Sequence, residues 1–362
     1  MDSQNGLEIL IVGLGDLGRK IALRLAACSD VGAIILAGQR TETGRSFSRL
    51  VAACSHAKVD FVFLNALDSE AVSDLLHARQ PDAVVQCAAL LSPWLLHERS
   101  DAVARSILNA GFAVQLPAQL PIVTSVMRAV RSTGYRGSVV NCSYPDVTHP
   151  VLARMGLAPT TGIGNSGMIH NLIRATLSEA PHSGQRLSVV AHHSHVTAAA
   201  TNTDTQRRGI PAPLIFIDEE PLALKDLLRA QPSLASSIDL NHLTAAHAVE
   251  TLRALLTDGD EFSTSLPGPL GLPGGWPIRI KSREIQIALP TALSADEVQS
   301  FHVRAARGDG IDRIGDDGTV YFTHDAQEAV AGICPELALP LRPDAVIERA
   351  RVLRHTLTGA LQ

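Results

Sequence analysis

An apolar segment that runs directly into a glycine motif limits the possible folds of this chain more than any other feature. Leu7–Val12 (LEILIV) is followed by Gly13-Leu-Gly15-Asp-Leu-Gly18, and a helical pattern continues from there. In a strand that turns into a helix, the first glycine makes the tight turn, the second lets backbone approach a pyrophosphate, and the third lets the helix pack on the strand. The motif therefore predicts a dinucleotide-binding site.

Apolar runs alternate with helical patterns as far as residue 145. Four further runs have the length and composition of buried parallel strands. They are Ala33–Ala37, Val59–Leu64, Ala83–Cys87 and Ser138–Asn141. Strands that alternate with helices are typical of α/β proteins with right-handed crossovers. We therefore expect residues 1–145 to form a Rossmann domain, which is a doubly wound parallel sheet that binds a dinucleotide.

Residues 146–362 have a less regular pattern. Helices are expected over residues 166–177 and 244–256, and a third should begin at Ser294, which has the spacing of a capping box. Three short segments are expected to pair as an antiparallel sheet. They are Phe262–Leu266, Pro277–Ile280 and Glu284–Ala288. The second half should therefore be an α+β domain for catalysis and oligomer contacts, with a C-terminal extension after about residue 308.

The composition excludes several classes of function. Of the 362 residues, 46% are hydrophobic, 19% are charged and 4% are aromatic, and the formal net charge is −5. A chain with no basic cluster and few aromatic residues lacks the usual surface for nucleic acid, and no apolar run has the length of a membrane helix. The five cysteines are scattered without a C-x-x-C pair, which is typical of reduced thiols. We expect a cytoplasmic protein that acts on a small molecule.

The end of the second expected strand indicates which dinucleotide binds. An NAD site usually has an acidic residue there, which binds a ribose hydroxyl. This chain has Gln39, Arg40 and Thr41 instead. Because a guanidinium pairs well with a 2′-phosphate, NADP is favoured, with Arg40 as the first candidate for this contact and Arg45 as the second. NAD held by other contacts remains open. The variable positions of the glycine motif, Asp16 and Leu17, are expected in the same phosphate-binding turn.

Three histidines crowd residues 192–195 at the end of another apolar run. If a strand continues through them, His193 and His195 face one side and His192 faces the other. A metal would need further ligands, and the nearest candidates, His149 and His170, come without a carboxylate motif. We therefore expect no metal, because one neutral histidine that transfers protons near neutral pH is the simpler interpretation.

Residues 138–194 resemble the lactate/malate dehydrogenase family in the order of their segments. Val139–Val147 stands where that family has a strand ending in Asn-Pro-x-Asp, and Gly162–Asn171 stands where it has a glycine turn and the catalytic helix. Val189–Ser194 matches the strand that ends in Gly-Glu-His-Gly, so the resemblance implies that His193 is the catalytic proton donor and acceptor. The order of the C-terminal segments extends the resemblance over roughly residues 7–308.

The resemblance also implies further site residues. Ala88 and Ala89, after the fourth strand, would face the cofactor. Asn141 or Ser143 would lie near its nicotinamide amide, in place of the family asparagine, although such polar groups at strand ends also commonly satisfy nearby backbone. His195 is the second catalytic candidate in the histidine cluster.

This sequence departs from the family pattern at two positions that orient the catalytic histidine and bind the substrate. Met168 and Asn171 stand at the positions of the aspartate that orients the histidine and of the arginine that binds the substrate carboxylate. Neither can replace those charges, although Asn171 can hydrogen-bond a neutral carbonyl, hydroxyl or amide. Arg99 and Arg105 are candidates for the arginine of the family's active-site loop. We therefore expect a substrate that is not a simple 2-hydroxy acid.

Together these features predict an NADP-dependent oxidoreductase in which His193 passes a proton while a hydride moves to or from a carbonyl, imine or carbinol carbon of a small polar metabolite. Three alternatives remain open. Residues 82–89 are similar to the fourth strand of the saccharopine-dehydrogenase-like group, which would imply an imine reductase. The others are a nucleotide-dependent enzyme that oxidises, eliminates and reduces again, and a non-catalytic NADP sensor. The resemblance also implies a homodimer or homotetramer.

Overall fold

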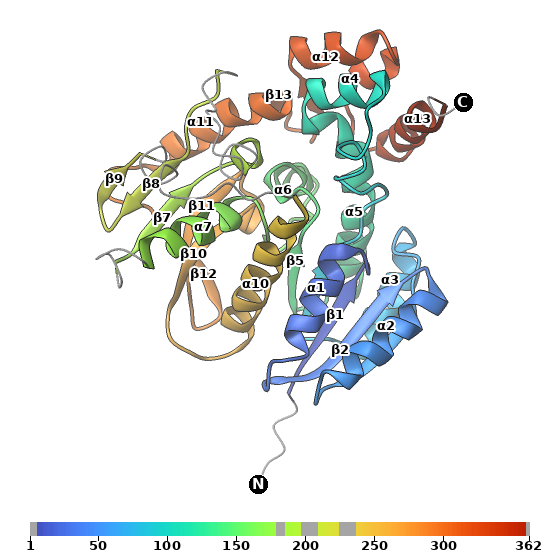
Figure 1. Ribbon diagram of the computed structural model, residues 1–362, viewed down its shortest axis with the longest axis vertical. Helices are drawn as coiled ribbons and strands as arrows, with labels where there is room; N and C mark the ends of the chain where they lie inside the picture. Colours follow the sequence, from blue (N-terminus) through green and yellow to red (C-terminus); the bar gives the residue numbers. More distant parts are fainter. Residues whose placement is uncertain (1–5, 179–184, 197–208, 224–236, 360–362) are drawn as a thin grey trace.

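A six-stranded parallel sheet forms the first part of the computed structural model, which describes residues 6–178, 185–196, 209–223 and 237–359 (Figure 1). The strand order β3-β2-β1-β4-β5-β6 is that of the Rossmann fold. All five neighbouring pairs are parallel. The strands are β1 Leu7–Val12, β2 Val31–Gly38, β3 Lys58–Phe63, β4 Ala83–Gln86, β5 Ser138–Asn141 and β6 Thr161–Gly162. The expected doubly wound sheet is confirmed.

Helices cover both faces of this sheet. Successive side chains of β1 point to opposite faces, and the helices bury them on each side. Leu10 and Val12 are buried in a core with α3, α4 and α5, whereas Ile9 and Ile11 are buried in a core with α1, α2 and α10. The helices are α1 Asp16–Leu25, α2 Thr41–Ala53, α3 Ser69–Arg79, α4 Ala102–Ala110, α5 Leu116–Thr133 and α10 Ser237–Leu256.

The sheet and its helices differ from the expectation in three places. The sixth strand, Thr161–Gly162, lies beyond the expected domain boundary at residue 145. The helices α2 and α4 were not predicted from the sequence, and α5 begins at Leu116, whereas its sequence pattern predicts a helix from Pro121 to Arg131. The apolar face of α4 consists of Ala104, Ile107 and Ala110. This helix packs against α12 (His324–Ala331), which lies near the end of the chain. A contact so distant in sequence leaves little local signal.

Two three-stranded antiparallel sheets lie in the described part of the second half, besides the hairpin of the C-terminal extension. One has the order β10-β11-β12 and pairs the segments expected to pair, and the other has the order β7-β8-β9. A bridge between Ala191 and Gly275 joins the two sheets. The strands are β7 Leu187–Val190, β8 Leu214–Ile217, β9 Glu220–Leu222, β10 Phe262–Pro267, β11 Gly275–Lys281 and β12 Glu284–Ile287.

The helices of the second half include α6 Pro145–Arg154, α7 Ser166–Ser178 and α11 Ala295–Ala306. The capping box at the start of α11 is confirmed, since Ser294 accepts from Glu297 N and the Glu297 carboxylate accepts from Ser294 N. The histidine cluster is different from the expectation. β7 ends at Val190, and His193–His195 form a short 3₁₀ helix, η2, so the alternation of a strand does not apply there.

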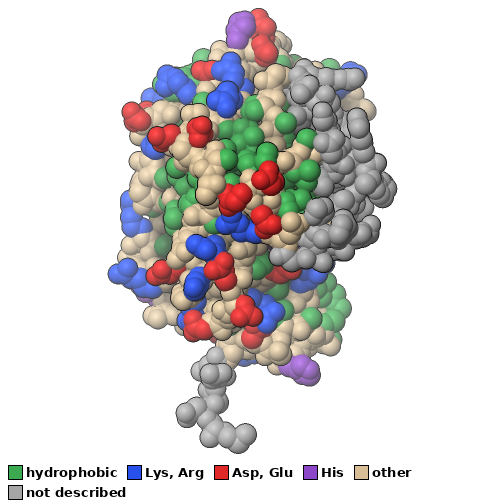
Figure 2. Space-filling model, turned by 90° about the vertical axis from the view of Figure 1, so that its left-hand side faces the viewer, with side chains coloured by type: hydrophobic (Ala, Val, Ile, Leu, Met, Phe, Trp, Pro, Cys, Tyr) green, Lys and Arg blue, Asp and Glu red, His purple; other side chains and the backbone are tan. Residues whose placement is uncertain are grey.

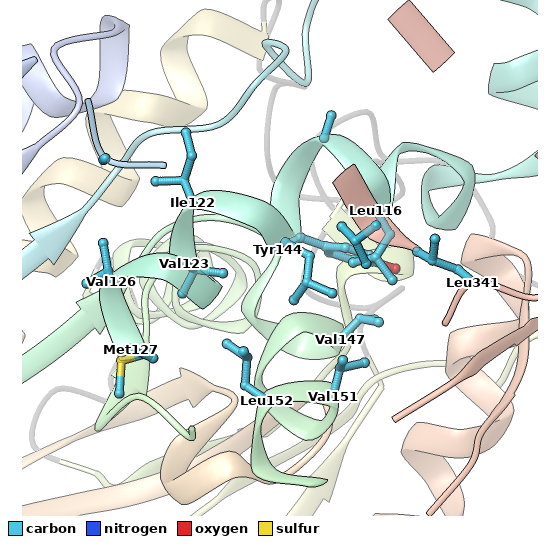
Figure 3. Close-up of a cluster of buried hydrophobic side chains, with 14 of the residues drawn as sticks. Leu116, Ile122, Val123, Val126, Met127, Tyr144, Val147, Val151, Leu152 and Leu341 are labelled. Atoms are coloured by element: carbon cyan, nitrogen blue, oxygen red, sulfur yellow. The ribbon is translucent and has the colours of Figure 1, made fainter. Parts of the chain in front are cut away.

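The C-terminal extension packs into the same core as the Rossmann helices. It contains the turn η5 Arg307–Asp309, the hairpin β13 Ile311–Ile314 and β14 Val320–Phe322, and the helices α12 His324–Ala331 and α13 Val346–Gly359. Figure 3 shows Leu341 of the extension near Leu116 of α5 and the α6 side chains Val147 and Val151, all within one buried cluster. The extension is therefore an integral part of the core.

The surface carries charges of both signs. On the face shown in Figure 2, basic and acidic side chains are interspersed around a band of hydrophobic side chains. Among the described residues, no single helix is long and apolar enough to cross a membrane, although α4 and the helical stretch Phe112–Thr133, bent by 112°, together meet that test of length and composition. Much of α5 is buried in the protein core.

Candidate functional site

A cavity of about 1030 Å³ lies along the C-terminal ends of β1, β2, β4 and β5. The glycine motif after β1 lines one part of it and His193 lines another. Ligands of open α/β sheets bind outside the carboxyl ends of the strands, where the strand order reverses. The fold therefore brings the two main features of the sequence, which are 175 residues apart, into one cavity.

The three motif glycines occupy different environments. Gly13 has φ +100°, and a Cβ added there would lie 2.6 Å from Ala88 N. A Cβ on Gly18 would lie 2.1 Å from the carbonyl oxygen of Gly13, so the first and third glycines are required by close packing. A Cβ on Gly15 would have no atom within 4 Å, and Gly15 lines the cavity. This open space beside the start of α1 fits a pyrophosphate.

Asp16 and Leu17 both line the cavity, but Asp16 is already engaged. Its carboxylate accepts hydrogen bonds from Lys20 Nζ (2.5 and 2.6 Å) and from Asn241 Nδ2 (2.7 Å). Partial burial favours the protonated acid, yet these two partners outweigh it and hold the pKa of Asp16 below its ordinary value. Asp16 therefore ties α1 to α10, and Lys20 offsets its negative charge beside the glycine turn.

The residues after β2 lie at another part of the cavity. Gln39 and Arg40 line it, and Gln39 Nε2 donates to Asn65 Oδ1 at 2.7 Å. The Arg40 side chain is exposed at the start of α2 and has no hydrogen bond or ion pair with any described residue. Thr41, the first residue of α2, is not among the lining residues. The second candidate, Arg45, is exposed on α2 and does not line the cavity, so Arg40 is the candidate arginine that the structure leaves unpaired at this part of the cavity.

The ends of β4 and β5 form the wall nearest to His193. Ala88, Ala89 and Ser143 line the cavity, as do the thiols of Cys87 and Cys142, whose sulfur atoms are 3.5 Å apart.

Asn141 does not line this wall, although the resemblance placed it near the nicotinamide. Its side-chain oxygen accepts from Ser143 N (3.0 Å), and its amide nitrogen lies 3.1 Å from both Thr148 Oγ1 and His149 Nε2. Asn141 therefore shapes the strand end that presents Ser143.

His193 is held by two buried carboxylates. Its Nδ1 lies 2.9 and 3.1 Å from the two oxygens of Asp309, and its backbone N–H donates to Asp146 Oδ1 at 2.9 Å. The rings of Phe112 and Tyr144 lie 4.4 and 4.9 Å from the imidazole ring. About a quarter of the His193 side chain remains exposed (25%), so the ring is fixed but accessible from the cavity.

The charges around His193 set its protonation. Desolvation favours the neutral ring, but the charge of Asp309 and its hydrogen bond outweigh this effect and raise the pKa of His193 above the ordinary value. Burial likewise favours the protonated form of Asp309, yet His193 and the Tyr144 hydroxyl keep its pKa below the ordinary value. Asp309 therefore stabilises the protonated form of a histidine that is accessible from the cavity, which suits proton transfer.

The other two histidines of the cluster have structural partners. His195 is fully buried, its Nδ1 accepts from His192 N (2.8 Å), and its Nε2 lies 2.7 Å from the carbonyl oxygen of Pro211. Both ring nitrogens are therefore occupied, and neither His192 nor His195 lines the cavity. This geometry gives no support to His195 as a catalytic residue. Among the described residues, no group of three or more His, Cys, Asp or Glu side chains could hold a metal.

Several solved structures are similar to this chain, whereas no protein-family model and no curated protein matches it. A lactate dehydrogenase from a Medee basin deep-sea metagenome library has 13% sequence identity and a TM-score of 0.50, over 84% of this chain and 97% of the other. The minor L-lactate dehydrogenase of Enterococcus mundtii has 14% identity and a TM-score of 0.53, over 84% and 96%. The lactate dehydrogenase of Eimeria maxima with NADH and oxamate has 15% identity and a TM-score of 0.51, over 85% and 95%.

The fold is that of the lactate dehydrogenases. Identities of 13–15% establish the fold and leave the reaction to be argued from the site.

Within this lactate dehydrogenase-like fold, the residues that depart from the family pattern take no part in binding an acid at the cavity. Met168 lines the cavity with an apolar side chain, and Asn171 is buried outside the cavity lining. Arg99 forms an ion pair with Asp101 (2.7 Å) and donates to the carbonyl oxygen of Leu357, while Arg105 is exposed on α4. Neither arginine lines the cavity.

Three residues around His193 were missing from the sequence analysis. They are Phe112, Tyr144 and Asp309, which lie on the turn after α4, before α6 and after α11. Asp309 stands between Gly308 and Gly310, which marks a tight turn in the sequence but does not show that the acid is buried. Its connection with a histidine 116 residues away could not be found from spacing.

Proposed function

We propose that this chain is an NADP-dependent oxidoreductase that moves a hydride to or from a carbonyl, imine or carbinol carbon of a small polar molecule. The observation that carries the proposal is the shared cavity, which joins a dinucleotide-type glycine turn to an accessible histidine held by a buried carboxylate. A purely structural glycine turn would need neither the open space at Gly15 nor a proton-transfer group beside it.

The chain's own residues would hold the nucleotide along this cavity. Backbone N–H groups at the start of α1 would bind the pyrophosphate beside Gly15, and Arg40 with Gln39 would bind the 2′-phosphate. The ring that carries the hydride would lie against Ala88 and Ser143 at the ends of β4 and β5. When bound, the nicotinamide supplies or accepts the hydride, and the protein supplies orientation and the proton.

His193 would supply that proton. Its Nδ1 faces Asp309, so Nε2 is the nitrogen left to donate to, or accept from, the oxygen or nitrogen on the reacting carbon. Asp309 stabilises the charged ring that forms when Nε2 takes the proton. A positioned general acid or base typically contributes a rate factor of about 10² to 10⁴.

The substrate would differ from a simple 2-hydroxy acid. Met168 gives the cavity wall an apolar side chain at the position that the family uses for an aspartate, and Asn171 does not reach the cavity in place of the carboxylate-binding arginine. Phe112 and Tyr144 add aromatic surface next to His193. A neutral carbonyl or imine with an apolar substituent fits these walls better than a short dianionic or monoanionic acid.

Affinity for the two nicotinamide cofactors tests this proposal. We expect the purified protein to bind NADPH more tightly than NADH, as measured by fluorescence titration. Arg40→Ala should weaken NADPH binding about 10- to 100-fold and leave NADH unchanged, because a hydrogen bond to a charged group contributes about 1.5–3 kcal/mol.

Arg49→Ala is the matched control, since Arg49 is an exposed arginine of α2 that does not line the cavity. A protein that binds neither nucleotide would refute the proposal. Binding of NADPH without turnover of any carbonyl or imine tested, followed at 340 nm, would favour the sensor alternative.

A further inference from the structure

Asp309, which faces His193, comes from a part of the chain where the family pattern has no such acid. The lactate dehydrogenase-like pattern expects an acid on α7, at the position of Met168, but a thioether cannot pair with an imidazole N–H. Asp309 of the turn η5 occupies the place beside Nδ1 instead. The partner of His193 is thus supplied by the C-terminal region.

Close backbone packing fixes the turn that carries Asp309. Gly111 has φ +95°, and a Cβ there would lie 2.4 Å from the Asp309 carbonyl group. Gly310 has φ +89°, and a Cβ there would lie 2.2 Å from the carbonyl oxygen of Ala110. Because a glycine on each side allows this approach, the backbone at the end of α4 packs directly against the backbone of the turn η5. The position of the Asp309 carboxylate is therefore set by backbone rather than by a flexible loop.

The Asp309 carboxylate has few competing partners. The Tyr144 hydroxyl donates to Oδ2 at 2.8 Å. His192 Nδ1 lies 3.5 Å from the same oxygen, but it accepts a hydrogen bond from Ser194 N, and burial lowers the pKa of His192. A neutral His192 whose Nδ1 is an acceptor has no proton to give to Asp309. The carboxylate is left to His193 and Tyr144.

We propose that Asp309 is the positioning residue of this site: it holds His193 in the Nδ1–H tautomer, directs Nε2 into the cavity and stabilises the protonated ring. Asp146 fixes the backbone of the same histidine through a separate element, α6. Two buried carboxylates thus fix the ring and the main chain independently. The expected effect of Asp309 on turnover rests on the proposed function. The effect of Asp309 on the tautomer and charge of His193 does not, because it needs no substrate.

Asp309→Asn tests the proposal, since it removes the charge and keeps the shape. An amide can donate to Nδ1 and so stabilise the opposite tautomer. We expect the pKa of His193, followed by NMR of the ring, to fall relative to wild type. We expect kcat to fall about 10²- to 10⁴-fold while the Kd for NADPH changes less than about twofold. Asp316→Asn, at an exposed acid between β13 and β14, is the matched control and should change neither.

Tyr144→Phe gives a second readout in the opposite direction. Without the hydroxyl that donates to Asp309, the carboxylate is more basic, so the pKa of His193 should rise. If the pKa of His193 is the same in wild type, Asp309→Asn and Tyr144→Phe, the positioning role is wrong, even if the enzyme is active. If the protein reduces nothing but the two shifts occur with these signs, the positioning holds and the proposed function fails. Thermal denaturation of each variant checks that it is folded.

Discussion

Three histidines within four residues acquire three different environments. His192 is buried and caps the turn η2, His195 is buried with both nitrogens occupied, and His193 alone reaches the cavity. Their residue type and position in sequence are nearly the same, so the difference comes from neighbours. The Asp309 carboxylate raises the pKa of His193, whereas burial lowers the pKa of His195 to about 4. Of the three, only His193 combines access from the cavity with a carboxylate partner that stabilises its protonated form.

Replacement of this ring should separate turnover from binding. We expect His193→Ala to lower kcat about 10²- to 10⁴-fold, because the general acid and base is lost, with the Kd for NADPH almost unchanged. Steady-state kinetics and fluorescence titration measure the two quantities. His324→Ala, at an exposed histidine of α12, should leave both unchanged. Full activity of His193→Ala would assign proton transfer to another group.

At the scale of elements, the β1–α1 turn illustrates what local sequence can encode. The strand Leu7–Val12 was predicted with its observed bounds, and so was the start of α1 at Asp16. The apolar run of this strand and the glycines that follow it are visible in the local sequence, as is the capping box of Ser294. The strand β6 has only two residues, which are too few to form a pattern, and the helix α4 is stabilised by packing against α12 near the end of the chain.

The glycines of this turn should respond differently to alanine. Gly15→Ala places a Cβ in open space of the cavity, so we expect a change in Tm below about 2 °C but strongly weakened nucleotide binding. Gly18→Ala places a Cβ 2.1 Å from a carbonyl oxygen, so we expect a clear loss of Tm. Calorimetry with and without NADPH measures both effects. Equal nucleotide affinity of Gly15→Ala and wild type would contradict a phosphate site at this turn.

At the scale of the molecule, the extension and the Rossmann helices share one hydrophobic core. Leu341, Leu353 and Leu357 belong to the same buried cluster as β1 and α5, and Arg99 donates to the carbonyl oxygen of Leu357. The segment before α4 and the end of α13 are thereby joined. The turn that carries Asp309 also packs on the end of α4. The extension therefore belongs to both the stability and the site of the protein.

Buried histidines should make the whole molecule sensitive to mild acid. Burial lowers the pKa of His149, His170 and His195 to about 4 and that of His247 to about 3. Below the ordinary value of 6.5 the unfolded chain binds protons that the folded chain does not, so stability is full above pH 6.5 and falls towards pH 4. The raised pKa of His193 favours the folded state as the pH falls, but it is one group against four.

We therefore expect Tm, measured by calorimetry, to fall by at least about 5 °C between pH 7 and pH 5, because each such histidine contributes up to about 1.4 kcal/mol per pH unit. His324→Ala should show the same dependence, since His324 is exposed. A Tm that stays level over this range would mean that the four buried rings are solvated or charged in the folded protein.

Local sequence determined the glycine turn after β1 and the alternation of strands and helices, and the order of segments shared with the lactate/malate dehydrogenases selected His193. These depend on hydrophobic periodicity, on glycine geometry and on residue order, which are all properties of contiguous segments. The tertiary structure alone decided that Asp309 faces His193, that Tyr144 and Phe112 enclose the ring, and that Asn141 and His195 are used internally. Such contacts join residues more than 100 positions apart or depend on which side chains reach the same space, and a single sequence carries no distance between them.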